Sequence, residues 1–467
     1  MKYLLQPDYR LLGWKGEPFY LARRSTGRTW RLSPAEFAYL LRCDGETEMG
    51  DDEWPPVPAW AVREKIVAEC APGEHLLPEQ AYRLYPNRKM DYMELSLTGR
   101  CNLNCKHCFN AADCNPRTVE PTLEQLLTLL RKLKDCGVCR MRLNGGEPLT
   151  RKDFLTVTGE MAKLGIVPCE IITNGVLITP ELLDELEKQG HRPIWFVSFD
   201  GLGHHDWLRG VPGTEEKVLK NIRLLCDRGY YVHVHQCVWK DSLDSIRPTV
   251  LRMKELGVSR YRLITVEPSL RWRETAPEQT VSTEEWLEFL PDFLDWWYEN
   301  DIDLDLDVWS YWTGSRGSRR VTIVPDLFSR GEDNSALSCP EYPNRFFIDA
   351  DGRMVRCMPL SGGTSALGIP CPNVYEGDDL QEVMMKSDFL TDMTCTCLEL
   401  KRQNPECLAC RWFDRCGMGC RAEALTQGLP DRVSLTGIDR RMCLFFNSGC
   451  YEKLKAVAEK HGLEYTA

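Results

Sequence analysis

The sequence has no long hydrophobic run and no segment typical of a secretion signal. No stretch approaches the roughly 18 apolar residues that a membrane-spanning helix needs. The first residues reach Gln6, Asp8 and Arg10 before an apolar core can form. We therefore expect no membrane insertion and no export, which leaves a reducing cytoplasm as the default compartment. In that compartment, cysteines are expected as thiols or metal ligands rather than as disulfides.

An excess of positive charge is also missing. The 58 Lys and Arg residues are outnumbered by 69 Asp and Glu residues, which gives a net charge of -11. This balance excludes broad, non-specific binding of nucleic acid or of anionic membranes. With 43% hydrophobic and 27% charged residues, the composition is that of a globular protein with a large core. A chain of 467 residues is expected to form two or three domains.

Cysteine, in contrast, is abundant and unevenly distributed. The chain has 22 cysteines, although it is too large to need a disulfide scaffold. Three of them fall within residues 101–108, and eleven lie between Cys339 and Cys450. This clustering predicts two separate metal-binding regions.

The middle of the chain alternates short β-favouring runs with longer amphipathic stretches, which is typical of βα units around a parallel sheet. We predict strands near residues 93–97, 140–143, 169–173, 194–198, 232–238 and 261–266. Helices are predicted near residues 123–134, 151–163, 181–188, 215–226, 246–256 and 284–298. Six units are fewer than the eight of a closed barrel, so the prediction for residues 89–320 is an α/β fold, a partial (β/α)6 TIM-like barrel.

The regions on either side of this barrel differ from it. Residues 19–32 predict two strands joined by a glycine-containing turn, and Ser33 then caps a helix with Pro34 in its first turn and Glu36 closing a capping box. Residues 1–88 are therefore expected to form a small winged-helix-like domain. The segment 314–320 interrupts the βα pattern and marks the boundary to a cysteine-rich third domain over residues 321–467.

The first cysteine cluster directly follows the first predicted barrel strand. Cys101, Cys105 and Cys108 lie on a short loop at the carboxyl end of that strand, where barrel enzymes place their chemistry. Three thiolates do not complete a four-ligand site, so a [4Fe–4S] cluster held by them keeps one iron open to another ligand. The alternative is a structural zinc site with His107 as fourth ligand, but such sites usually recruit a second, more distant ligand pair.

This CxxxCxxC run, together with the Gly145-Gly146-Glu147-Pro148 turn after the second strand, resembles the radical S-adenosylmethionine (radical SAM) superfamily. The resemblance implies that the three cysteines hold a [4Fe–4S] cluster whose open iron binds S-adenosylmethionine. Reductive cleavage of that molecule then gives a 5′-deoxyadenosyl radical, which abstracts hydrogen from a substrate. The resemblance also implies an external electron donor of the flavodoxin or ferredoxin type.

The same resemblance suggests which residues bind S-adenosylmethionine. Gly145 and Gly146 present backbone groups to its amino group, with Glu147 beside them. The further contacts implied are His107 at the adenine, Asn174 after the third strand, and Ser198 and Asp200 at the ribose and carboxylate. Ordinary turn chemistry explains the Asn174 and Asp200 segments nearly as well. The GxIxGxxE element of the superfamily is not recognisable, which leaves the other adenine contacts unassigned.

The second cysteine region resembles the SPASM domain, an extension of radical SAM enzymes that binds two auxiliary [4Fe–4S] clusters. With the radical SAM cluster, this implies three clusters in total. The resemblance assigns Cys339, Cys357 and Cys420 to the first auxiliary cluster, and Cys407, Cys410, Cys416 and Cys443 to the second.

Several assignments in this region stay open. The first auxiliary cluster lacks a fourth ligand, for which Cys395 and Cys397 are candidates and Cys371 is a weaker one; otherwise its open iron binds substrate. Cys450 is the alternative to Cys443, and zinc-ribbon pairs are the alternative for Cys407 to Cys420. The other cysteines are taken as small buried hydrophobic residues or incidental thiols: Cys43, Cys70, Cys114, Cys136, Cys139, Cys169 and Cys226.

The N-terminal domain suggests the substrate. Its pattern resembles the winged helix of enzymes that mature ribosomally synthesised and post-translationally modified peptides (RiPPs), which holds a leader peptide as a strand added to a sheet edge. An ordinary packing extension is the alternative. We therefore expect an oxidoreductase that binds a precursor peptide through its leader and installs a crosslink, with a cysteine thioether as the favoured product. The alternatives are carbon–carbon or ether crosslinking, epimerisation, sulfatase-maturase-like oxidation, and a non-catalytic iron–sulfur protein that binds leaders.

Catalytic acid–base residues are not identified by any motif. Glu267, Asp305 and Asp307 lie near predicted strand ends and are candidates for bases or peptide contacts, although solvated or ion-paired carboxylates have the same pattern. Cys237 on the fifth strand is a candidate hydrogen donor, as an epimerase would need.

Overall fold

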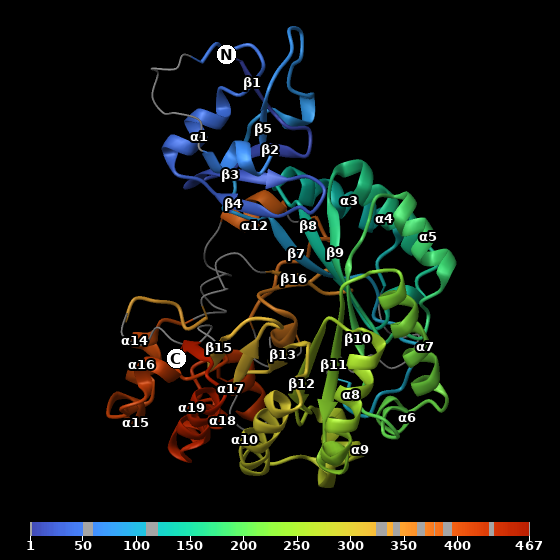
Figure 1. Cartoon of the computed structure of the whole chain (residues 1–467), viewed down its shortest axis with the longest axis vertical. Coiled ribbons are helices and arrows are strands. Elements are labelled where there is room, and N and C mark those ends of the chain that lie inside the picture. The colour runs from blue at the N-terminus through green and yellow to red at the C-terminus, as the bar shows by residue number, and fades with distance from the viewer. Residues whose placement is uncertain are drawn as a thin grey trace.

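The computed structural model describes residues 2–49, 59–108, 120–323, 334–339, 346–361, 369–377, 379–385, 395–428 and 434–466. Cys114 lies outside these ranges. The N-terminal domain lies at one end of the molecule, next to a large central sheet, and the C-terminal helices lie along one side of that sheet (Figure 1). No helix in the described ranges combines the length and the apolar character that crossing a membrane requires.

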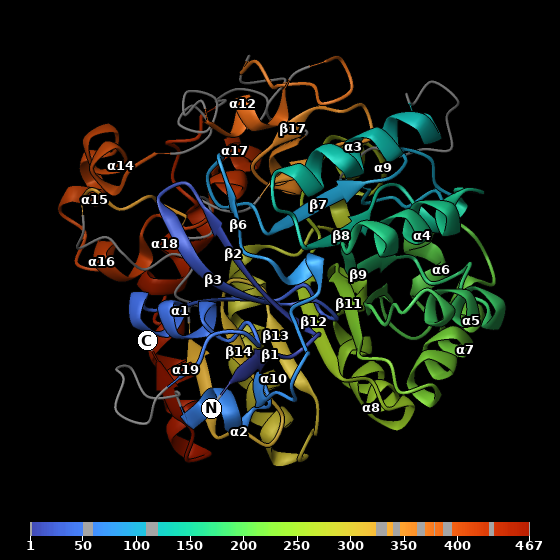
Figure 2. The same cartoon turned by 90° about the horizontal axis from the view of Figure 1, so that it is seen from above.

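The central sheet confirms the predicted partial barrel. Its first six barrel strands pair in parallel and in chain order: β7 (Tyr92–Ser96), β8 (Arg140–Asn144), β9 (Val167–Thr173), β10 (Ile194–Ser198), β11 (Val232–Val238) and β12 (Arg260–Thr265). Helices cover one side of this sheet: α3 (Leu123–Asp135), α4 (Phe154–Leu164), α5 (Pro180–Lys188), α7 (Thr214–Asp227), α8 (Ile246–Leu256) and α10 (Thr283–Glu299) (Figure 2).

The sheet also contains a parallel strand that the sequence did not predict. Strand β13 (Asp305–Val308) pairs with β12, so Asp305 and Asp307 lie within a strand rather than beside strand ends. Its sequence, Asp-Leu-Asp-Val, is short and half acidic, and such a composition is unfavourable for strands. Tertiary pairing overrides that preference, because all four of its residues are buried.

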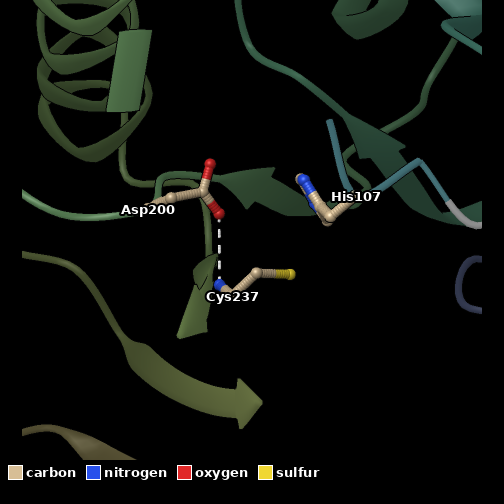
Figure 3. A group of neighbouring side chains, drawn as sticks. All are labelled: His107, Asp200 and Cys237. Atoms are coloured by element: carbon tan, nitrogen blue, oxygen red, sulfur yellow. Dashed lines mark hydrogen bonds between the residues drawn. The ribbon is translucent and has the colours of Figure 1, made fainter. Parts of the chain in front are cut away.

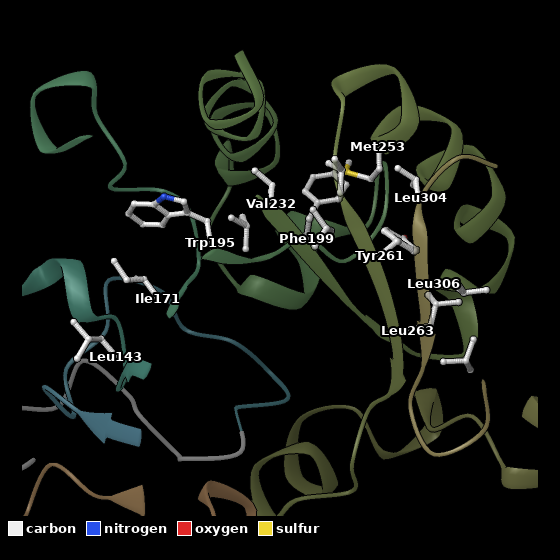
Figure 4. Packing of buried hydrophobic residues seen from close by; sticks show 14 of the residues in the cluster. Leu143, Ile171, Trp195, Phe199, Val232, Met253, Tyr261, Leu263, Leu304 and Leu306 are labelled. Atoms are coloured by element: carbon white, nitrogen blue, oxygen red, sulfur yellow. The ribbon is translucent and has the colours of Figure 1, made fainter. Parts of the chain in front are cut away.

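The two faces of the barrel strands have different chemistry because successive side chains point to opposite sides. Leu143, Ile171, Val232 and Leu263 pack in the hydrophobic core beneath the helices (Figure 4). Residues that alternate with them meet inside the barrel, where Arg142 pairs with Glu94 and Glu170, Arg262 pairs with Asp307, and His233 lies against His235. The floor below the carboxyl ends of the strands is therefore polar.

The third region flanks both edges of the barrel sheet. Strand β16 (Phe347–Ile348) pairs with β7, and β17 (Met354–Val355) follows it. At the other edge, β13 is followed by β14 (Trp312–Gly314), β15 (Arg320–Ile323) and β18 (Glu464–Thr466). The sheet continues across residue 320, where a domain boundary is predicted. That boundary stays a prediction.

The other described elements of this region are helices: α12 (Leu380–Met385), α14 (Cys397–Gln403), α15 (Pro405–Leu408), α16 (Phe413–Cys416), α17 (Arg421–Gly428), α18 (Arg440–Asn447) and α19 (Cys450–Lys460).

The N-terminal domain combines two small sheets with short helices. Its four-stranded sheet has the order β4 (Thr29–Arg31), β3 (Glu17–Arg23), β2 (Tyr9–Trp14), β6 (Arg83–Tyr85), and β1 (Tyr3–Leu5) pairs with β5 (Val67–Glu69). Helix α1 (Pro34–Leu41) begins with the predicted capping box, in which Ser33 and Glu36 each accept from the other's backbone N–H. Helix α2 (Ala59–Arg63) completes the domain.

This domain is attached to the barrel by buried contacts. The indole of Trp14 donates to the carbonyl of Cys136 at 3.0 Å, and Arg10 donates to the thiol of Cys139 at 3.2 Å. Both cysteines are fully buried, in agreement with their interpretation as packing residues.

Candidate active site

A cavity of about 330 Å³ opens at the carboxyl ends of the barrel strands. Most of the residues expected to bind the radical SAM cluster or S-adenosylmethionine line this cavity together: Cys101, Cys105, His107, Cys108, Gly145, Gly146, Asn174 and Ser198. The third region closes the cavity from the other side with Met358, Pro359, Ala422, Glu423 and Thr426. One site therefore joins the barrel mouth to the cysteine-rich region.

The three cysteines of the first cluster meet at one wall of this cavity. Burial raises the pKa of Cys101 to about 12, and the neighbouring Cys105 and Cys108 add to the effect. Three neighbouring thiols, one buried and two partly buried, have the donor chemistry for an iron–sulfur cluster, and binding it requires the release of their protons. The residues present therefore fit the group that the resemblance implies.

His107 lies in the cavity wall without a metal-site geometry of its own. Burial lowers its pKa to about 3, so the imidazole is neutral, and its Nδ1 has no hydrogen-bond partner among the described residues. Its side chain lies within 4.8 Å of the ligand atoms of Asp200 and Cys237 (Figure 3). The carboxylate of Asp200 already accepts two hydrogen bonds from Arg209, so these three residues form a poor cation site. A neutral aromatic ring beside the cluster loop does fit the expected contact with adenine.

The turn after β8 requires its two glycines. A Cβ at Gly145 would lie 2.4 Å from the carbonyl oxygen of Thr98, and one at Gly146 would lie 2.2 Å from that of Arg100. The N–H groups of Gly146 and Glu147 donate to these same two carbonyls at 2.7 and 2.8 Å. These hydrogen bonds fix the turn to the loop that carries the cysteines. The backbone carbonyl oxygens of the turn are the groups that can accept hydrogen bonds from an amino group.

Glu147 is fully buried behind the cavity wall rather than in it. Its carboxylate accepts hydrogen bonds from the Thr173 hydroxyl at 2.8 Å and from the backbone N–H of Asn174 at 2.7 Å. Burial raises its pKa to about 7. Asn174 in turn donates to Asn102 at 2.8 Å and lies 3.9 Å from the sulfur of Cys101. Glu147 therefore positions a cavity residue, and a direct contact with S-adenosylmethionine stays a prediction.

Asp200 has a similar indirect role. It is fully buried and forms two hydrogen bonds with Arg209, from Nε at 2.5 Å and from Nη2 at 3.0 Å. His205 lies 3.2 Å from the same carboxylate. Arg209, in helix α6 (His205–Arg209), lines the cavity and is the residue that sequence reasoning missed here. No motif surrounds it; only the fold brings it to the cluster loop.

Arg209 is a fixed buried cation. Burial opposes its charge, but Asp200 raises the pKa of Arg209 well above its usual value. Its Nη1 lies 3.7 Å from the sulfur of Cys105. A guanidinium at this distance would place positive charge beside a cysteine sulfur bound to a metal cluster.

Two of the four candidate catalytic residues reach the cavity and two do not. Cys237 lines it, and burial raises the pKa of this thiol to about 12, which keeps it neutral. Glu267 also lines it. Asp307 instead pairs with Arg262 inside the barrel, with 2.8 Å between Oδ2 and Nε, and Asp305 pairs with Arg260 at 3.3 Å. Both aspartates are held in structural ion pairs.

A charged cluster that the sequence did not reveal joins the cavity to the third region. Arg441 on α18 lies 3.1 Å from Glu267 and 3.0 Å from Glu423, and 3.3 Å from Asp439. Asp439 accepts from the backbone N–H of Cys420 at 3.3 Å. This group of charged side chains therefore connects Glu267 in the cavity to the chain segment that carries Cys420, a predicted ligand of the first auxiliary cluster.

The four cysteines predicted for the second auxiliary cluster lie together. Cys407, Cys410, Cys416 and Cys443 line one small cavity of about 20 Å³ between α15, α16 and α18, with Trp412, Phe413 and Phe446 around them. Cys450 is elsewhere: it is buried in α19, and its thiol contacts the carbonyl of Leu287 in α10 at 3.5 Å. This arrangement favours Cys443 over Cys450 as the ligand.

The first auxiliary site is less complete. Cys339, Cys357 and Cys420 all pack against one apolar group formed by Leu360, Ala422, Leu425 and Leu435. Of the candidates for a fourth ligand, Cys395 lies 3.5 Å from the hydroxyl of Ser338, the neighbour of Cys339 in the chain. Cys395 and Cys397 both pack in one group with Cys407, and Cys371 packs near Phe347, so the Ser338 contact is what separates Cys395 from Cys397. Contacts thus favour Cys395, and the ligand itself stays a prediction.

Comparison with protein families and curated proteins agrees with the barrel chemistry. Residues 95–246 match the Radical SAM superfamily model. An AdoMet-dependent heme synthase from Methanosarcina barkeri is 32% identical over 207 residues, which cover 44% of this chain and 56% of that protein. A heme synthase from Nitratidesulfovibrio vulgaris is 26% identical over 70% of this chain and 86% of its own. A PqqA peptide cyclase from Granulibacter bethesdensis is 25% identical over 37% of this chain and 46% of its own.

Comparison with solved structures extends over nearly the whole chain. Streptococcus suis SuiB bound to S-adenosylmethionine has a TM-score of 0.63 at 16% identity, with 94% of this chain and 99% of that one covered. SuiB bound to its precursor peptide SuiA has a TM-score of 0.61. The anSMEcpe protein with bound AdoMet and the Cp18Cys peptide has a TM-score of 0.57 at 18% identity, with 79% and 99% covered. At these identities the likeness is one of fold.

Proposed function

We propose that this chain, which carries a radical SAM domain, is a maturase that crosslinks a ribosomally made precursor peptide, with a cysteine thioether as the favoured product. One observation carries the proposal: the thiols of Cys101, Cys105 and Cys108 and the third-region residues Glu423 and Thr426 line the same cavity. A radical formed at the cluster would therefore arise next to the region that the resemblance assigns to auxiliary clusters.

The cofactors define what the residues must do. The three cysteines would hold a [4Fe–4S] cluster, and S-adenosylmethionine bound to it supplies a 5′-deoxyadenosyl radical. Asn174, Ser198 and His107 would orient that molecule from the cavity wall. Arg209 keeps a positive charge beside Cys105, and the enclosing wall excludes water, which protects a reactive radical.

Crosslinking is a net two-electron oxidation. One hydrogen atom leaves a carbon of the peptide and joins the deoxyadenosyl radical, and a peptide thiol loses its proton as the carbon–sulfur bond forms. One electron would remain, and a cluster held by Cys407, Cys410, Cys416 and Cys443 would supply its acceptor. Glu267, a cavity carboxylate that also pairs with Arg441, would accept the proton.

The peptide class is supported by the relatives and by the N-terminal domain. SuiB and anSMEcpe were solved with peptides, and the PqqA cyclase is named for one. Strands β4 and β6 are the edges of the four-stranded sheet, and each carries an exposed apolar residue, Trp30 and Leu84. A leader added to such an edge would raise the effective concentration of the attached core peptide at the cavity.

Heme synthesis is a second candidate, because heme synthases match this chain over as much as 71% of its length. Epimerisation is a third, because Cys237 presents a neutral thiol to the cavity, as a hydrogen donor must. In an epimerase the thiol would return a hydrogen atom to the peptide radical, and no mass would be lost.

The experiment uses anaerobically reconstituted protein, S-adenosylmethionine, a reductant and a short peptide encoded beside the gene. We expect 5′-deoxyadenosine to form and the peptide to lose two hydrogens for each crosslink, measured by mass spectrometry. The Cys105→Ala variant should do neither. An unchanged mass with an inverted residue, lost again in Cys237→Ala, would assign epimerisation. In a parallel reaction with a porphyrin precursor added, heme formation with an unchanged peptide would assign the second candidate.

A further inference from the structure

One outer face of the molecule lies directly over the loop that carries the first cysteine cluster. Helix α6 and helix α9 (Leu270–Thr275) hold this loop from outside. The N–H groups of Asn104 and Lys106 donate to the carbonyls of Arg209 and Leu208 at 3.1 and 2.9 Å. The Thr275 hydroxyl donates to the carbonyl of Lys106 at 3.1 Å. The backbone between Cys101 and Cys108 is therefore fixed just below the surface here.

An aromatic side chain is exposed on this face. The indole of Trp207 is 41% exposed, which is unusual for a residue of its size. It stacks on the buried Trp239, with ring centroids 5.4 Å apart, and meets the buried Trp272 edge-on at 6.4 Å. The exposed ring is thus held rigidly. Rigid exposed aromatic residues are enriched at the centre of protein interfaces.

The same face presents two cations, Lys106 and Arg271, on a protein of net charge -11, and the acidic residues of its two helices are Asp206 and Glu274. Lys106 lies with its ammonium 5.0 Å from the centre of the Trp207 ring, and Arg271 contacts the side chain of Asn104. Within the described ranges, neither Lys106 nor Arg271 has a carboxylate in salt-bridge distance. The nearby Asp206 is engaged with the start of α7 through Gly213 and Thr214. We call Asn104, Lys106, Trp207 and Arg271 the Trp207 face.

The position of the Trp207 face separates it from the other binding regions. Helix α6 lies on the opposite side of the molecule from α14, α15 and α16, in both views (Figures 1 and 2). A partner bound at α6 would leave the second auxiliary site and the N-terminal domain uncovered. It would also lie close to the cluster loop, since Arg209, which reaches to 3.7 Å from the sulfur of Cys105, belongs to the same short helix as Trp207.

We propose that the Trp207 face is the docking site for a small acidic protein that carries single electrons. This inference depends on the proposed function, because a radical SAM domain needs an electron from outside. The carrier's reduced cofactor would lose one electron to the cluster held by Cys101, Cys105 and Cys108, and no atom would be transferred. Arg271 and Lys106 would pair with carboxylates of the carrier, and Trp207 would pack into its surface.

The first test measures binding and does not depend on catalysis. Oxidised flavodoxin is titrated against the reconstituted protein, and its Kd is measured at low and at high salt. We expect Arg271→Glu and Trp207→Gln each to weaken binding by about tenfold or more, and wild-type binding to weaken with salt. The control is Lys188→Glu, a charge reversal at an exposed position on α5. Equal Kd values for wild type and Arg271→Glu, or no binding of flavodoxin or an acidic ferredoxin to wild type, would overturn the proposal.

The second test compares two reductants in the same variants. 5′-Deoxyadenosine formation is driven either by flavodoxin with its reductase and NADPH, or by dithionite. We expect Arg271→Glu to lose most of the flavodoxin-driven rate and to keep the dithionite-driven rate. Equal losses with both reductants would mean that the face is only structural. If wild type forms no 5′-deoxyadenosine with dithionite, the proposed function fails, while the binding measurement still decides the docking site.

Discussion

Nη1 of Arg209 lies 3.7 Å from the sulfur of Cys105, while the same guanidinium forms two hydrogen bonds with the carboxylate of Asp200. All three residues are buried. Removing only one partner of a buried ion pair strongly destabilises a fold, because the other charge stays buried without a counter-charge. The Asp200–Arg209 ion pair therefore stabilises the fold and also holds a positive charge beside the loop that carries the cysteines.

The Arg209→Met variant tests this double role. We expect the free energy of unfolding to fall by about 3 to 5 kcal/mol, because Asp200 stays buried without a counter-charge. Denaturant titration under anaerobic conditions measures it. Adding Asp200→Asn should recover part of the loss. As a control, Arg228→Met removes surface ion pairs with Asp184 and Glu187, which should leave the free energy of unfolding close to that of wild type. Similar losses for Arg209→Met and Arg228→Met would contradict the prediction.

Glu147 should make stability depend on pH. Burial raises its folded pKa from 4.5 to about 7, so between these values the folded protein keeps a proton that the unfolded chain releases. Its contribution to stability is therefore present below pH 4.5, falls as pH rises to about 7, and is constant above that. Glu147→Gln removes this slope. Denaturant titrations on both sides of pH 7 should show the advantage of wild type over the variant shrinking as pH rises. A constant difference would show that Glu147 does not titrate in this range.

Glu147→Gln should also loosen the turn that it holds. One oxygen that accepts from the Asn174 N–H or the Thr173 hydroxyl becomes an NH2 group, and a buried hydrogen-bond partner is lost. We expect a cost of about 1 to 3 kcal/mol, measured above pH 7, where the pH effect is flat. Thr179→Ala, which removes a helix-capping hydroxyl outside the cavity, provides a reference of about 1 kcal/mol.

The choice between Cys443 and Cys450 can be tested by iron content. Cys443 shares a small cavity with Cys407, Cys410 and Cys416, whereas Cys450 contacts Leu287 in the barrel helix α10. We expect Cys443→Ala to lower the iron and sulfide bound after reconstitution by as much as one cluster, and Cys450→Ala to leave both unchanged. Chemical iron analysis and electron paramagnetic resonance measure the difference. Loss of iron in Cys450→Ala alone would reverse the assignment.

The sequence predicted the parts of this fold that local patterns determine. Each of the six predicted barrel strands and helices is present, because their hydrophobic periodicity spans many residues. The capping box at Ser33 is present because it depends on four consecutive residues. Strand β13 was missed because its acidic sequence becomes a strand only by pairing with β12.

The sequence also located the cavity but not the way its wall is supported. Glu147 and Asp200 belong to motifs, yet both lie behind the wall and act through Asn174 and Arg209. Arg209 and Arg441 belong to no motif. Arg209 lies 104 residues from Cys105 in the chain, and Arg441 lies 174 residues from Glu267, so only the folded chain brings these residues together. Such long-range charge pairs leave no signal in a single sequence.

We expect Arg441 to stabilise the contact between the third region and the barrel. It pairs with Glu267 after β12, with Glu423 on α17 and with Asp439 before α18, and all four side chains are mostly buried. Burial and the neighbouring Glu267 raise the pKa of Glu423, while Arg441 opposes them. In Arg441→Met the three acidic groups lose their shared cation, which should cost about 3 to 5 kcal/mol.

The loss should be confined to one part of the molecule. We expect backbone amides of α17 and α18 to exchange hydrogen faster in Arg441→Met, while those of β8 and β9 keep wild-type rates, because local opening follows the contacts that are lost. Arg440→Met, at the exposed neighbouring position of the same helix, is the matched control and should leave exchange unchanged. Adding Glu423→Gln to Arg441→Met should restore part of the protection, since it removes one of the buried acidic groups left without a cation. Uniformly faster exchange across the barrel would show that Arg441 stabilises the whole fold rather than the junction between its two halves.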